Sequence, residues 1–327
     1  MGKNLLAGNL SKGICENLKC VEGQLILEDQ QNHGIYESEV IEVNPFTNLV
    51  MSWRSKTHEN ASVEIWVKIR TEGRWSSWFS YGKWSDQGNN TGSFSGQKDI
   101  LATLDVDLLL VNRGHADACA VRVELFRKDI ETPTPVFENY YMAFKPVEGC
   151  VKVPFVDKAV DIHLKVQAYS QLDIPEIGNK ICSPTCVSMV MAYYGLEKQI
   201  TDTAKGVIDN GTGIYGNWSY NVAYANERGF RSHVERLENL HEISLYLKEG
   251  IPLIASIKTR DLGALQGAYQ TYPSGHLVVI TGLFYKEGQY YFRVNDPAAN
   301  TSDKVPREYL VEEFLNVWNG IVYVIRR

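Results

Sequence analysis

No window of the sequence approaches the roughly 18 consecutive apolar residues that a membrane-spanning helix requires. The first residues, MGKNLL, lack the apolar core of a secretory signal, and Leu6 stands where a myristoylation signal needs serine or threonine. These absences predict a cytoplasmic protein without a membrane span. Secretion remains open if a leader was removed ahead of residue 1.

The sequence also has no excess of positive charge. Its formal net charge is -6, which argues against a surface that binds nucleic acid. We therefore expect no nucleic-acid partner.

Cysteine is scarce, and its spacing excludes the common zinc motifs. No two cysteines form a CxxC pair. Cys182 and Cys186 would share one face of a helix, but the sequence supplies no two further ligands nearby. We predict no metal, no other cofactor and mostly free thiols. Cys15 and Cys20 lie close enough in sequence to pair if the protein is exported.

A chain of 327 residues is comfortable for two domains. After a polar arm over residues 1–35, short apolar or alternating runs predict strands, among them 38–43, 49–53, 63–69 and 119–126. Strands at this spacing predict an all-β sandwich of jelly-roll or fibronectin-like type over 36–130. Residues 131–158 are interpreted as a linker, because the run ETPTP near its start suits neither a sheet nor a helix.

The predicted sandwich is rich in tryptophan, at Trp53, Trp66, Trp75, Trp78 and Trp84. Packing in the core and at the edges is the commoner use of this side chain. The alternative is an aromatic platform for a carbohydrate or peptide ligand. Alternation along 63–69 places Trp66 on the face opposite the aliphatic residues, so both interpretations stay open.

Helix-like and strand-like segments alternate after residue 158, which predicts a second domain of α+β or α/β type over 159–327. The helices are expected at 182–194, 201–209, 218–228, 241–249 and 308–318, and the strands at 252–257, 276–284, 290–296 and 321–325. The run GTGIYG at 211–216 matches GxGxxG, but no buried strand precedes it, so we expect a flexible loop rather than a dinucleotide site.

The segment 182–194 is predicted to be a buried helix whose first residue is a cysteine. Pro184 suits the first helical turn, and Gly195 suits the left-handed residue that ends a helix. Unpaired N–H groups and the dipole at a helix N-terminus stabilise an anion and lower the pKa of a thiol. Cys182 is therefore a candidate nucleophile, with an inert buried cysteine as the alternative.

Two strong strand patterns, 276–284 and 290–296, flank a turn predicted at 285–289. Pairing His276 with Asp296 centres that turn on Lys286. An odd loop places the two side chains directly opposite each other, whereas an even loop requires a bulge to align them. A carboxylate on one ring nitrogen fixes the tautomer of an imidazole and supports its protonated form. His276 and Asp296 are thus the candidate base and orienting residue, with Asn295 as the second choice for the latter.

Thiol hydrolysis also needs donors for the oxyanion of the tetrahedral intermediate. The backbone N–H of Cys182 and the side-chain amide of Gln171 are the candidates. Loops 210–220 and 262–274 are expected to wall the cleft, and Tyr215 and Trp218 are candidate substrate-binding residues. Core packing is the alternative for Trp218.

Four motifs together resemble the C39-like branch of the papain-like cysteine peptidases. They are YSQ ending at Gln171, CSPT beginning at Cys182, GHLVVITG containing His276 and NDP containing Asp296. The resemblance implies a papain-like α+β fold for 159–327. It also implies that Cys182 rather than Cys186 is the nucleophile, that Gln171 serves the oxyanion hole, and that Asp296 orients the base His276.

One residue departs from the family pattern, and the first domain is less specific. Ser183 stands where the family has glycine, so its side chain is expected to contact substrate and could crowd the approach of a carbonyl. The runs GIYES at 34–38 and WSSW at 75–78 resemble β-sandwich modules found ahead of C39-like domains in bacterial proteins.

We therefore predict a cysteine peptidase or amidase that hydrolyses a peptide or amide bond in a peptide or protein substrate through Cys182, His276 and Asp296. Two alternatives stay open, because one scaffold can host several functions. One is an inactive peptidase scaffold that binds peptide or carbohydrate. The other is an acyltransferase that uses the same three residues.

Overall fold

The computed structural model describes residues 4–86, 91–147 and 156–327, which group into two compact units. The strand-rich unit comprises the described residues of Asn4–Gly149 together with Gly206–Gly229. The mixed unit comprises the described residues of Cys150–Lys205 and Phe230–Arg327. The second half of the chain therefore contributes one segment, 206–229, to the strand-rich unit.

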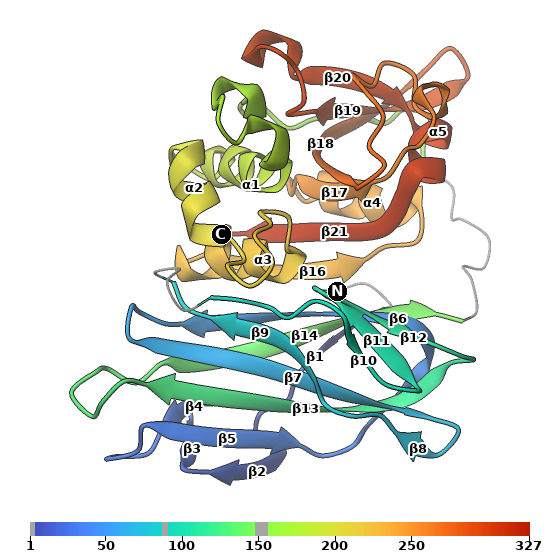
Figure 1. Cartoon of the computed structure of the whole chain (residues 1–327). Helices are drawn as coiled ribbons and strands as arrows, with labels where there is room; N and C mark the ends of the chain where they lie inside the picture. Colours follow the sequence, from blue (N-terminus) through green and yellow to red (C-terminus); the bar gives the residue numbers. More distant parts are fainter. Residues whose placement is uncertain (1–3, 87–90, 148–155) are drawn as a thin grey trace. The chain divides into compact units, whose positions relative to one another are not determined.

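The strand-rich unit is built almost entirely of antiparallel strands (Figure 1). They are β1 (Leu5–Ala7), β2 (Gly13–Glu16), β3 (Leu18–Val21), β4 (Gln24–Leu27), β5 (His33–Ser38), β6 (Ile41–Lys56), β7 (Ala61–Thr71), β8 (Arg74–Trp75), β9 (Phe79–Trp84), β10 (Gln97–Lys98), β11 (Ala102–Asp105), β12 (Leu108–Val111), β13 (Ala116–Arg127) and β14 (Val136–Pro146).

The long strand β6 joins two groups of strands. Its first residues pair with β13, which also pairs with β5 and β7, and the rest of β6 pairs with β14. Along β7 the aliphatic residues from Val63 to Ile69 are buried at alternate positions, while the residues between them, Trp66 included, are half-buried. This is the expected alternation of a strand that covers a core with one face.

Two predicted boundaries differ from the observed structure. Residues 1–35 are more than an arm, because β1 to β4 and the start of β5 pair within the sheet. The stretch 131–158 is more than a linker, because β14 occupies Val136–Pro146 and lies beside β6. The short strands among these have no clear apolar pattern. Where their backbone N–H and C=O groups pair with strands that are distant in sequence, such pairing cannot be read from the residues of the strand itself.

The tryptophans divide between core and surface. Trp53 and Trp84 are fully buried, and Trp75 is exposed. The ammonium group of Lys68 lies 5.1 Å from the ring centroid of Trp75 and 4.7 Å from that of Trp78. These cation–π contacts stabilise the rings of the exposed Trp75 and the half-buried Trp78 within the unit itself. A carbohydrate or peptide ligand on this surface stays a prediction.

In the mixed unit a seven-stranded antiparallel sheet has the order β16-β21-β17-β18-β19-β20, with β15 paired to β18 (Figure 1). The strands are β15 (Asp161–His163), β16 (Arg231–Arg236), β17 (Leu253–Ile257), β18 (His276–Lys286), β19 (Gln289–Asn295), β20 (Pro306–Leu310) and β21 (Trp318–Arg326). The α-helices are α1 (Cys182–Tyr193), α2 (Ile200–Val207), which runs into the segment 206–229, α4 (Leu240–Lys248) and α5 (Val311–Val317).

Most predicted elements of the mixed unit lie within two residues of the observed ones, and one is wrong. The single helix expected at 308–318 is the end of β20 followed by α5. The core between α4, α5 and the sheet includes Ile243, Ile280 and Phe314. Within the described part of the chain, no helix has the length and apolar character needed to cross a membrane.

The segment 206–229 carries α3 (Trp218–Glu227), which packs on β6 within the strand-rich unit. The Ser219 hydroxyl donates to the carbonyl of Met51 at 2.6 Å, and the Asn226 side chain donates to the carbonyl of Trp53 at 2.8 Å. The run GTGIYG forms a turn before this helix, with a bridge between Asp209 and Ile214; its expected flexibility stays a prediction.

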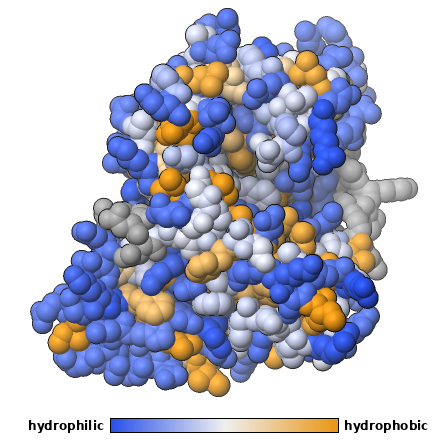
Figure 2. All heavy atoms as spheres, in the orientation of Figure 1, coloured by the Kyte–Doolittle hydropathy of each residue, from blue (hydrophilic) through white to orange (hydrophobic). Residues whose placement is uncertain are grey.

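The surface gives little sign of a large apolar docking area in the view of Figure 2. On that face, apolar side chains are dispersed among hydrophilic ones. Scattered exposed apolar residues of this kind are normal for a globular protein.

Candidate active site

Helix α1 presents two cysteines one turn apart, and they lie in different surroundings. Cys182 is the first residue of the helix and is half-buried, whereas Cys186 is fully buried. The Cys186 thiol lies 3.3 Å from the carbonyl oxygen of Leu277 and donates to it. Of these two thiols, only that of Cys182 belongs to a partly exposed residue.

The pKa values of the two thiols shift in opposite directions. Burial raises the pKa of Cys182, but the hydrogen bond and charge of His276, helped by the backbone N–H groups of Leu277 and Ser183, outweigh it and leave the pKa lowered. Burial raises the pKa of Cys186 well above its usual value, and the neighbouring Cys182 and Asp296 add to this. A lowered pKa makes Cys182 the more thiolate-like of the two.

The hairpin that carries the imidazole and carboxylate differs from its predicted register. The turn holds only Glu287 and Gly288, at φ 51° and 89°, as in a two-residue type I′ turn. The five-residue turn expected at 285–289 is therefore wrong. The register then shifts between Ile280 and Gly282. An even turn followed by a bulge is the second of the two arrangements that the sequence left open.

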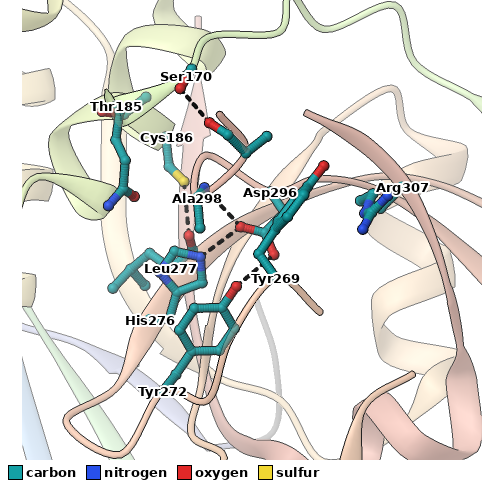
Figure 3. Close-up of polar contacts among 12 residues, drawn as sticks. Ser170, Thr185, Cys186, Tyr269, Tyr272, His276, Leu277, Asp296, Ala298 and Arg307 are labelled. Carbon is teal, nitrogen blue, oxygen red and sulfur yellow. Dashed lines mark hydrogen bonds and ion pairs between the residues drawn. The ribbon is translucent and has the colours of Figure 1, made fainter. Parts of the chain in front are cut away.

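His276 and Asp296 meet at the end of this hairpin, as Figure 3 shows. The distance from His276 Nε2 to Asp296 Oδ1 is 2.7 Å, and both side chains are buried. Burial lowers the pKa of His276, but Asp296 and Cys182 together raise it above its usual value. Burial raises the pKa of Asp296, but the charge and hydrogen bond of His276 and further donors lower it. The pair therefore favours an imidazolium beside a carboxylate.

Three donors besides His276 converge on the Asp296 carboxylate. The backbone N–H of Ala298 donates to Oδ1 at 3.0 Å, while the hydroxyls of Tyr272 and Tyr309 donate to Oδ2 at 3.1 Å and 2.7 Å. The sequence predictions missed both tyrosines. Tyr272 lies in a loop without periodic pattern, and Tyr309 lies in a segment that was predicted to be helical.

Gln171 is buried and begins the short 3-10 helix η1 (Gln171–Asp173). Its backbone N–H donates to the carbonyl of Pro297 at 2.9 Å, so it is tied to the loop that follows Asp296. Its Nε2 donates to the carbonyl of Gly178 at 2.7 Å. A side-chain amide has two N–H donors, so this bond orients the amide and leaves its second N–H for another acceptor.

The side chains of Ser183 and Asn295 form their hydrogen bonds away from the reacting groups. Ser183 is fully buried and its hydroxyl lies 2.9 Å from that of Tyr323, so the expected contact between the Ser183 hydroxyl and substrate has no support from its position. Asn295 donates to the carbonyls of Val166 and Gln167 rather than to His276.

Tyr215 and Trp218 belong to the segment 206–229 and are half-buried in the strand-rich unit. The backbone N–H of Trp218 donates to the buried carboxylate of Asp107 in that unit. A role of Tyr215 and Trp218 in binding substrate stays a prediction.

Comparison with family models places this chain in a known group of proteins. Residues 163–325 match the model of the Peptidase_C39 like family, and residues 24–143 match that of the Peptidase C39 N-terminal domain. The chain therefore belongs to the C39-like peptidase family. This confirms the family that the sequence motifs indicated.

Several solved structures are similar at low identity. A double glycine motif protease from an AMS/PCAT transporter, in complex with the leader peptide, is 21% identical over 51% of this chain and 97% of that chain, with a TM-score of 0.35. The peptidase domain of Streptococcus ComA, a bi-functional ABC transporter, is 16% identical over 47% and 96%, with a TM-score of 0.34. The potassium-bound carbohydrate recognition domain of Emp46p is 12% identical over 42% and 91%, with a TM-score of 0.26. No curated protein matches the chain.

Proposed function

We propose that this protein is a cysteine peptidase or amidase of papain-like fold, with a peptide or protein substrate. One observation carries the proposal. The half-buried thiol at the start of α1 has a pKa lowered by His276, whose Nε2 lies 2.7 Å from the buried carboxylate of Asp296. A nucleophile, a base and an orienting residue in this order are the components of thiol-dependent acyl transfer.

The reaction proceeds through an acyl-enzyme. The Cys182 thiolate attacks the carbonyl carbon, and the imidazolium of His276 protonates the leaving amine as the C–N bond breaks. His276 then takes a proton from water, the resulting hydroxide attacks the thioester, and the thiolate leaves. Asp296 keeps one imidazole tautomer throughout, because it holds the Nε2–H.

The oxyanion needs two donors near the nucleophile. As the first residue of α1, Cys182 has a backbone N–H with no partner inside the helix. The second N–H of the Gln171 amide, whose first is bound to Gly178, is the other proposed donor. The role of Gln171 as an oxyanion donor predicts that Gln171→Ala loses turnover while the rate of Cys182 alkylation stays unchanged.

The first test is the pH dependence of alkylation by iodoacetamide, measured separately for each cysteine by peptide mass spectrometry. In the wild type we expect Cys182 to react rapidly already at pH 6. In His276→Ala its rate should rise only near pH about 8.5, as for an ordinary thiol. The exposed cysteines Cys15 and Cys20 serve as internal references, and the buried Cys186 should stay unlabelled in the folded protein.

Two outcomes would refute the proposal. One is a Cys182 rate that follows the same pH profile in wild type and His276→Ala. The other is hydrolysis of peptide or amide libraries that persists in Cys182→Ala. Cys186→Ala is the matched control, since it removes a thiol from the same helix and should leave Cys182 alkylation unchanged.

A further inference from the structure

The loop between β17 and β18 is held tightly at Tyr272. The backbone N–H of Tyr272 donates to the carbonyl of Thr259 at 3.1 Å and to its hydroxyl at 2.8 Å, and the Thr259 N–H returns a bond at 3.2 Å. Earlier in the loop, Arg307 donates to the carbonyl of Gly267 at 2.7 Å, and after Tyr272 the Gly275 N–H donates to the Tyr272 carbonyl at 3.1 Å. Tyr272 therefore projects from a backbone fixed on both sides.

The Tyr272 ring lies flat against the imidazole of His276. The ring centroids are 4.0 Å apart and the planes differ by 11°; Figure 3 draws the two side chains next to each other. Tyr272 is only 4% exposed. A ring in this position limits rotation of the imidazole and keeps water from the hydrogen bond that joins His276 to Asp296.

The hydroxyl of the same residue fixes the carboxylate. Tyr272 and Tyr309 both donate to Oδ2 of Asp296, which leaves Oδ1 for His276 and for the backbone N–H of Ala298. Burial raises the pKa of both phenols, and the charge of Asp296 raises it further. Both phenols therefore remain O–H donors at neutral pH.

We propose that Tyr272 is a positioning residue for the base, acting through its ring on His276 and through its hydroxyl on Asp296. Tyr309 acts on Asp296 alone, which makes it the matched control within the same site. The proposal rests on the assignment of His276 as the base. Neither tyrosine is proposed to touch substrate.

The test measures the imidazole directly, by proton NMR of protein labelled with nitrogen-15 in histidine. In the wild type we expect a downfield signal from the His276 Nε2–H, identified by its loss in His276→Ala and protected from exchange with water. Tyr272→Leu should expose this proton and broaden or remove its signal. Tyr272→Phe, which keeps the ring, and Tyr309→Phe should both retain it with a changed chemical shift.

A second measurement follows the pH profile of Cys182 alkylation in the same variants. We expect Tyr272→Leu to slow the reaction at pH 6 by about tenfold, since it removes the ring against His276 and a hydrogen bond to a charged carboxylate. Tyr272→Phe and Tyr309→Phe should slow it less, since each removes one hydrogen bond to the Asp296 carboxylate and leaves the others in place.

A purely structural role would lower the melting temperature of Tyr272→Leu and leave both the protected signal and the pH profile as in the wild type, which would overturn the proposal. If Tyr272→Leu does not fold, loss of protection in Tyr272→Phe would also contradict it, because that variant keeps the ring. If Cys182 of the wild type is not alkylated rapidly in a His276-dependent way, the proposed hydrolase function is refuted instead. The NMR signal of the His276 Nε2–H would still show whether the Tyr272 ring protects that proton.

Discussion

Each unit of the molecule contains a carboxylate that accepts several hydrogen bonds, fully buried at Asp296 and half-buried at Glu227, and the pKa values of the two shift in opposite directions. In the mixed unit, four groups donate to Asp296, and its pKa is lowered. In the strand-rich unit, Glu227 at the end of α3 accepts from Thr57, Ser55 and Trp84, and its pKa is raised from 4.5 to about 7. The number of donors therefore does not decide the charge of a buried carboxylate.

The difference lies in the charges beside each group. Asp296 faces the imidazole of His276, whose protonated form offsets the cost of burial. Burial is the largest effect on Glu227, its hydrogen-bond donors are neutral, and Asp86 adds a like charge. The ammonium of Lys56 binds the backbone carbonyl of Glu227 instead of its carboxylate. The protonated imidazole in contact with the Asp296 carboxylate favours its charged form.

The largest expected effect comes from Asp296→Asn. An amide offers acceptor oxygen on one side only, so either the tyrosine hydroxyls or His276 and the Ala298 N–H would face an N–H group. We expect the alkylation of Cys182 at pH 6 to fall by about 100-fold, toward the rate of an ordinary thiol at that pH.

The stability of this variant provides a second readout. Because the folded-state pKa of Asp296 is lowered, its contribution is present above the unfolded pKa and is lost as pH falls through the folded pKa. The wild type should therefore lose more stability than Asp296→Asn on acidification below pH about 4 in urea titrations. A parallel loss in both proteins would contradict the assignment of an ionised Asp296.

Glu227→Gln is the corresponding change in the strand-rich unit, and its expected effect has the opposite sign. Oε1 of Glu227 accepts most of the bonds, so an amide oxygen can take its place. The raised pKa means that stability from the protonated group is present below the unfolded pKa of 4.5 and is lost as pH rises through about 7.

Between pH 5 and 8, we therefore expect Glu227→Gln to gain about 2 kcal/mol in free energy of unfolding relative to the wild type, a value reduced for partial exposure. The rate of Cys182 alkylation should stay unchanged. A variant that is less stable than the wild type at pH 8 would show that the folded protein stabilises the Glu227 anion, so that its pKa is not raised, and the comparison with Asp296 would fail.

The sequence predicted those parts of the fold that depend on local pattern. The alternation along β7 marks an element whose buried face can be read from the residue spacing. The packing of α3 was not predictable in this way, because its residues from Ser219 to Asn226 are all buried. A helix that is buried on all sides has no exposed face in its residue pattern, and the pattern then does not indicate which core the helix joins.

The same distinction explains the site. Cys182, His276 and Asp296 could be named as candidates because each stands at the end of a strongly patterned helix or strand. The register between the last two stayed open, because the sequence does not specify the two-residue turn and the bulge that together shift the pairing. Tyr272 and Tyr309 reach Asp296 only through tertiary packing, and no spacing along the chain encodes such a contact.

The smallest expected effect comes from Ser183→Gly, which tests a buried polar pair without charge on either side. The Ser183 hydroxyl lies 2.9 Å from that of Tyr323, beside the nucleophile in sequence but turned into the core. Loss of this bond and of a side chain in the helix should lower the free energy of unfolding by about 1 kcal/mol. The pH profile of Cys182 alkylation should not move, since the backbone N–H of residue 183 that supports the thiolate is retained. A higher alkylation rate in Ser183→Gly at an unchanged thiol pKa would show instead that the Ser183 side chain restricts the access of iodoacetamide to the Cys182 thiol.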